Sequence, residues 1–119
     1  EETRARLQDL TPQDLSVLVK AYARSGATNR EVLEVLAWEV LGRAHLFIPQ
    51  DLSTMAWAYA TLGIENLPLM EAIASQSIAK ISDFSMQDLV HTAWAFAKLG
   101  VLDEPLMAAL AAEFIPRFR

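Results

Sequence analysis

The feature of this chain that most constrains its fold is a stretch of sequence that recurs every 37 residues. Residues 49–63 have the sequence PQDLSTMAWAYATLG, and residues 86–100 have the sequence MQDLVHTAWAFAKLG. A weaker copy, PQDLSVLVKAYARSG, occupies residues 12–26. A fixed period of this length is typical of a solenoid, in which each unit buries its apolar face only by stacking on its neighbours.

Each unit is expected to contain two helices. The first helix starts at a cap, because Thr11 and Ser85 are each followed after three residues by Asp, as in a capping box. It ends at a glycine that suits the left-handed conformation of a helix C-terminus, and these glycines are Gly26, Gly63 and Gly100. The second helix is expected at roughly 30–45, 67–82 and 104–118. A basic residue in its last turns complements the helix dipole, at Arg43, Lys80 and Arg117.

Short connections of about two to five residues make consecutive helices antiparallel. The sequence therefore predicts an all-α fold, a right-handed α-solenoid of antiparallel helical hairpins with a 37-residue repeat, over residues 1–119 as one segment. Residues 1–10 are expected to be the tail of a preceding repeat, followed by repeats at 11–47, 48–84 and 85–119, the last incomplete. The chain is thus expected to be a segment of a longer array.

The composition narrows the classes of function. The chain has no Cys, and its two histidines, His45 and His91, fall at different places in the repeat, so we expect no metal site and no cofactor. The sequence contains no recognisable nucleophile with its base and no glycine-rich phosphate loop. Helix capping is expected to explain the repeated Asp14, Asp51 and Asp88. We therefore do not expect an enzyme. No apolar run approaches the roughly 18–20 residues that cross a bilayer, so we expect no membrane span.

One arc of each first helix lies outside the apolar stripe that is expected to stack the array. In the second unit, Leu52, Met55, Ala56 and Tyr59 cluster on one side at helical spacing and are expected to stack the array. The residues left over are Gln50, Thr54, Trp57 and Thr61, and the same positions in the other units hold Gln13, Val17, Lys20 and Arg24, then Gln87, His91, Trp94 and Lys98. These twelve residues are expected to form rows across the solenoid.

Two interpretations of these rows stay open. Single-stranded RNA fits if bases stack on Trp57 and Trp94 and phosphates meet the cations, while a variable row discriminates between bases. The cations are Lys20, Arg24 and Lys98, and the variable row is Val17, Thr54 and His91. Alternatively, the tryptophans wedge against the adjacent hairpin, the histidine is packed or solvated, and the glutamines only supply polarity at a helix start.

The charge distribution makes nucleic acid and protein equal electrostatic fits. The formal net charge is −5, whereas proteins that bind a phosphate backbone usually display a basic surface. The three first-helix segments nevertheless sum to zero, because the three cations balance Asp14, Asp51 and Asp88. The excess acid lies elsewhere in the chain, where distance and salt weaken its effect.

The recurring pattern QDL-x-x-x-A-W-A-[YF]-A-x-L-G, with PLM at residues 68–70 and 105–107, resembles the octotricopeptide and heptatricopeptide helical-hairpin repeats. These families belong to proteins of organellar gene expression and are often accompanied by a RAP domain. The 37-residue period fits the heptatricopeptide type best. The first unit departs from the pattern, because Lys20 replaces the Trp and Ser25 replaces the Leu before the glycine.

The resemblance implies an RNA-binding protein of a mitochondrion or plastid, in which the first helix of each repeat faces the RNA. The implied roles are transcript processing, stability, translation or ribosomal RNA assembly, with single-stranded or ribosomal RNA as partner. The alternative is a protein–protein scaffold or a structural subunit of a large organellar complex, with protein partners instead.

Overall fold

The structure is a computed structural model that describes residues 7–26 and 29–117, and the regular elements in these ranges are all helices. The predicted all-α class is therefore confirmed. The first six residues of the expected tail and the last two of the third repeat lie outside the described residues. The helices are α2 (Pro12–Ser25), α3 (Arg30–Arg43), α4 (Pro49–Leu62), α5 (Leu67–Ala79), α6 (Met86–Leu99) and α7 (Glu104–Arg117), with 3₁₀ turns η1 (Ala44–Leu46) and η2 (Ile81–Asp83).

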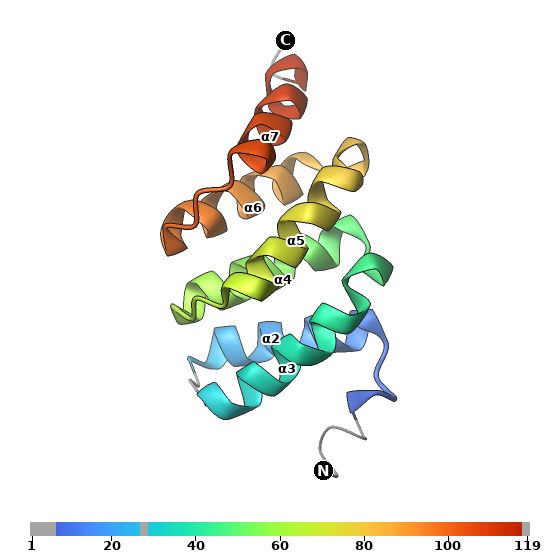
Figure 1. The fold of residues 1–119 in the computed structure, drawn as a ribbon, viewed down its shortest axis with the longest axis vertical. Helices are drawn as coiled ribbons and strands as arrows, with labels where there is room; N and C mark the ends of the chain where they lie inside the picture. The colour runs from blue at the N-terminus through green and yellow to red at the C-terminus, as the bar shows by residue number, and fades with distance from the viewer. Residues whose placement is uncertain (1–6, 27–28, 118–119) are drawn as a thin grey trace.

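The helices form three pairs that succeed one another along the long axis of the molecule (Figure 1). The principal extents are 50 × 24 × 22 Å. Helix α4 packs between α2 and α6, and α5 contacts both α3 and α7, so the first helices of the pairs make one layer and the second helices another. Each first helix also packs on the second helix of its own pair.

The predicted caps account for where the first helices begin and end. Asp14 donates its backbone N–H to Thr11 Oγ1 over 3.0 Å and accepts from the Thr11 N–H, and Ser85 makes the same reciprocal pair with Asp88. Both capping boxes are confirmed. Left-handed φ values of 74°, 70° and 70° at the three terminal glycines confirm the predicted helix ends at Gly26, Gly63 and Gly100.

The capping explanation is wrong for Asp51. Helix α4 has Ile48 at its N-cap position, and no side-chain hydrogen bond caps this helix. An isoleucine side chain has no oxygen to accept a backbone N–H, so the reciprocal pair cannot form. Asp51 instead lies buried in the layer of first helices.

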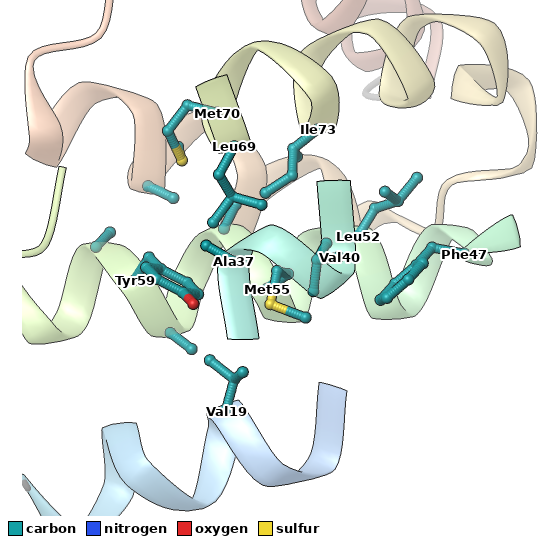
Figure 2. Packing of buried hydrophobic residues seen from close by; sticks show 14 of the residues in the cluster. Val19, Ala37, Val40, Phe47, Leu52, Met55, Tyr59, Leu69, Met70 and Ile73 are labelled. Atoms are coloured by element: carbon teal, nitrogen blue, oxygen red, sulfur yellow. The ribbon is translucent and has the colours of Figure 1, made fainter. Parts of the chain in front are cut away.

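The core fills the space between the two layers and between successive pairs. The predicted stacking residues Leu52, Met55, Ala56 and Tyr59 are fully buried. Figure 2 shows Val19 of α2 below Met55 and Tyr59 of α4, with residues of α5 on the other side of α4. The Tyr59 hydroxyl donates to the Leu33 carbonyl of the preceding pair over 2.6 Å. Burial of each large apolar side chain stabilises the stack by about 1.5–3 kcal/mol.

The basic residues at the ends of the second helices, of which Arg43 and Arg117 lie in the last turn as predicted, also make direct hydrogen bonds. The side chains of Arg43, Lys80 and Arg117 donate to the carbonyls of Leu10, Phe47 and Phe84 over 2.5, 2.6 and 2.6 Å. Each of these carbonyls lies just before the first helix of the same pair. A direct hydrogen bond that the sequence did not predict therefore closes each hairpin, and we call it the hairpin latch.

Candidate nucleic-acid interface

The twelve predicted binding residues all lie outside the core, on the layer formed by α2, α4 and α6. We call this surface the first-helix face. Because the three helices pack side by side in chain order, equivalent residues are neighbours across the face. The exposed members are Gln13, Val17, Arg24, Gln50, Thr61, Gln87, Trp94 and Lys98, and the half-buried members are Lys20, Thr54, Trp57 and His91.

Two adjoining hollows on this face together form a groove across the three helices. One has a volume of about 280 Å³ and the other of about 180 Å³. Four predicted residues, Lys20, Thr54, Gln87 and His91, line both hollows. The full lining brings together seven of the twelve, Lys20, Arg24, Gln50, Thr54, Trp57, Gln87 and His91, and adds Ser53, Ser85 and Asp88. The predicted Gln13, Val17, Thr61, Trp94 and Lys98 lie on the same face outside this lining.

Two aromatic rings meet in the groove. The ring centroids of Trp57 and His91 are 6.5 Å apart, with planes tilted by 34°. Trp57 is half-buried and packs against the core, so the packing interpretation holds for part of this side chain. Trp94, on α6, is 42% exposed. The two tryptophans therefore differ, since one combines packing with a place in the groove and the other offers a free indole.

The groove carries unpaired positive charge at its α2 end. Lys20 and Arg24 are one helical turn apart, and neither forms an ion pair or hydrogen bond with any residue in the described ranges. Lys98 on α6 is likewise without such a partner within the described part of the chain. Unpaired cations beside a hollow of this kind suit a phosphate group, because binding releases counterions from the nucleic acid.

A row of buried Ser–Asp contacts underlies the groove, and the sequence interpretation missed it. Ser53 Oγ on α4 donates to Asp88 Oδ1 on α6 over 3.2 Å, and the equivalent Ser16 on α2 acts on the Asp51 carboxyl of α4 and lowers its pKa. The two contacts are one sequence period apart, and all four residues are almost fully buried. The available signal was the Ser that follows QDL in the first two units, which Val90 replaces in the third.

Burial raises the pKa of the Asp51 carboxyl above its ordinary value, and the hydrogen bond from Ser16 offsets part of that rise. The carboxylate of Asp88 accepts from Ser53 Oγ and from the Ser85 N–H. Both donors stabilise the ionised carboxylate. Because Asp88 also lines the groove, its charge lies in the same hollow as Lys20.

Among the described residues, no cluster of three or more His, Asp or Glu side chains could hold a metal ion. None of the helices in the described part of the chain is both long enough and apolar enough to span a bilayer.

Comparison with known families identifies a relationship over nearly the whole chain. The model of the RNA-editing substrate-binding complex 6 protein (RESC6) family matches residues 3–116. No curated protein is detectably similar to the chain. The chain therefore belongs to the RNA-editing substrate-binding complex 6 protein family. This match supports the coarser part of the sequence resemblance, a helical protein associated with RNA, and gives no evidence for octotricopeptide or heptatricopeptide repeats.

Proposed function

We propose that this member of the RNA-editing substrate-binding complex 6 protein family is an RNA-binding subunit of such a complex, and that the groove holds single-stranded RNA. The observation that carries the proposal is that Lys20 and Arg24, which have no ion pair within the described ranges, lie beside the Trp57–His91 pair in one groove. The family name supports the proposal because it refers to the binding of RNA-editing substrates.

Each part of the groove has a role in this proposal. Lys20 and Arg24 contact consecutive phosphates, with Lys98 as a further contact on α6. A base lies against the Trp57 and His91 rings, since stacking on an aromatic side chain tolerates any base. Differences among Val17, Thr54 and His91 supply whatever base preference the protein has, because these residues vary while the glutamine row is constant.

The finer features expected from the repeat belong to the same proposal. A right-handed α-solenoid, with repeats at 11–47, 48–84 and 85–119, is supported by the order in which successive helix pairs pack. An array of this kind has an extended surface along which a single strand can run. A location in the mitochondrion, one of the two organelles expected from the resemblance, is also part of the proposal.

Salt-dependent titrations of labelled single-stranded RNA, read by fluorescence anisotropy, test the RNA role. The double variant Lys20→Ala/Arg24→Ala is expected to bind RNA more weakly than the wild type. The slope of log K against log salt concentration should become less steep by about 1.4, because each lost phosphate contact removes about 0.7 from it. Arg30→Ala is the matched control, because Arg30 is an exposed cation at the start of α3, in the other layer. Equal affinities and slopes for the wild type and the double variant would contradict the proposal.

A further inference from the structure

The layer of second helices carries an apolar hollow that the RNA proposal does not use. The hollow has a volume of about 440 Å³ and lies between α3 and the start of α5. Trp38 is 66% exposed and Leu67 is 49% exposed at its wall. The complete lining is Trp38, Leu41, Glu65, Asn66, Leu67 and Pro68.

The fold does not require these apolar side chains, as the equivalent positions of the other repeat units show. The position of Trp38 in α3 is occupied by Ser75 in α5 and by Ala112 in α7. The position of Leu67 is occupied by Arg30 and Glu104 in the other pairs. All four equivalent residues are exposed, so helices of this array form with polar or small residues there. A large exposed indole beside an exposed leucine is instead typical of a protein interface, where Trp often dominates the binding energy.

The wall of the hollow is held in place before any partner arrives. Asn66 Oδ1 accepts the backbone N–H of Leu69 over 3.0 Å and thereby caps α5. Pro68 lies in the first turn of the same helix, where its fixed φ angle suits the helix start. Trp38 and Leu41 lie on the adjacent α3. A preformed wall lowers the ordering cost of binding.

Charge around the hollow indicates the chemistry of the partner. Glu65 lines it, Glu34 is one turn before Trp38 on α3, and Glu71 is one turn after Leu67 on α5. None of these three carboxylates forms an ion pair within the described ranges, whereas Glu39 is paired with Arg43 over 3.3 Å. Of the two arginines of α3, Arg43 is thus paired, and Arg30, two turns before Trp38, has no ion pair within the described ranges. The rim is therefore acidic, and complementarity favours a basic partner.

We propose that the hollow between α3 and α5 docks a protein segment in which an aliphatic or aromatic anchor is flanked by Lys or Arg. The anchor packs against Trp38, Leu41 and Leu67, and the flanking cations meet Glu34, Glu65 and Glu71. RNA and protein would then occupy different layers of the fold, so each can bind without displacing the other.

The test uses short fluorescent peptides that share one apolar anchor and carry Lys, Ser or Glu flanks. The Lys-flanked peptide is expected to bind about tenfold more tightly than the Glu-flanked one, and salt should weaken it. Trp38→Ser introduces the residue that the equivalent position in α5 already holds, so the variant is expected to fold. It should weaken the binding of the Lys-flanked peptide by about tenfold or more. Trp94→Ser is the matched control, because it makes the same substitution at an exposed tryptophan on the first-helix face.

The same variants separate this proposal from the RNA role. Trp38→Ser should leave RNA affinity unchanged, and Lys20→Ala/Arg24→Ala should leave peptide affinity unchanged. Equal binding of the Lys- and Glu-flanked peptides, or full binding by Trp38→Ser, would overturn the docking proposal. Sedimentation that shows a wild-type dimer, dissociated by Trp38→Ser, would also overturn it, because a second copy would then be the occupant.

Discussion

The indole of Trp57 on α4 faces the imidazole of His91 on α6, with the ring centroids 6.5 Å apart and the planes tilted by 34°. The two residues come from successive pairs of helices and meet only because α4 and α6 pack side by side. The contact therefore joins neighbouring units and lines the groove at the same time.

The two tryptophans of the first-helix face are expected to respond differently to substitution. Trp57→Ala removes a half-buried side chain that packs on the core, and should lower the free energy of unfolding by about 2 kcal/mol and weaken RNA binding. Trp94→Ala removes an exposed ring and should change stability by less than about 0.5 kcal/mol. Urea denaturation and RNA titration measure both. A large loss of stability in Trp94→Ala would show that its indole is a packing residue.

The buried carboxyl of Asp51 predicts a pH dependence of stability. Its raised pKa means that the folded state binds this proton more tightly than the unfolded state does. The contribution of Asp51 to stability should therefore grow as pH falls from neutrality through the raised pKa, and level off below the ordinary value of 3.8. The free energy of unfolding of the wild type minus that of Asp51→Asn should rise over this interval in urea melts at stepped pH. A difference that falls instead would mean that the pKa is depressed.

The hairpin latch is expected to be a major source of local stability. Lys80→Met removes the donor from the carbonyls of His45 and Phe47 and should cost about 1.5–3 kcal/mol, because both hydrogen bonds come from a charged group. Lys98→Met is the matched control, since Lys98 is exposed and has no hydrogen bond or ion pair within the described ranges. Chemical denaturation compares the two variants. If both variants lose the same small amount of unfolding free energy, the hydrogen bonds of Lys80 do not contribute to stability.

Two glycines should respond to alanine with opposite signs. Gly63 ends α4 at φ 70°, a left-handed conformation in which a Cβ costs roughly 1–2 kcal/mol, so Gly63→Ala should destabilise. Gly42 lies within α3, and a Cβ built there meets no atom within 4 Å. Gly42→Ala should therefore stabilise by about 0.5–1 kcal/mol. Thermal melts of the two variants decide the signs, and a destabilised Gly42→Ala would indicate a constraint on α3 beyond helix propensity.

The first helices and their boundaries could be predicted because local chemistry marks them, with a capping box at two helix starts and a glycine at all three helix ends. Thr11 and Ser85 accept backbone N–H groups within their own first turn, and the terminal glycines need only their own backbone freedom. The sequence left open whether Trp57 and Trp94 pack or face solvent, and only the structure shows that Trp94 is exposed.

The parts that sequence reasoning missed depend on contacts between units. Asp51 resembles a capping residue in sequence, and only the packing of α4 against α2 brings it under the influence of Ser16. The hairpin latch joins residues that are 33 positions apart in the sequence, such as Lys80 and Phe47. A basic residue at a helix end is also expected from the helix dipole alone, so its presence did not point to the latch. Trp38 was overlooked because it does not recur in the repeat, although a departure from the repeat is where a docking residue should be sought.

The placement of RNA on the first-helix face is tested most directly by ultraviolet cross-linking of bound single-stranded RNA, with the modified peptides identified by mass spectrometry. We expect RNA adducts on residues of α4 and α6 that line the groove, with Trp57 and His91 foremost. Trp38, the most exposed of the three tryptophans, should remain unmodified on the second-helix layer. Adducts concentrated on Trp38 and its neighbours, with Trp57 and His91 unmodified, would contradict the assignment of RNA to the groove.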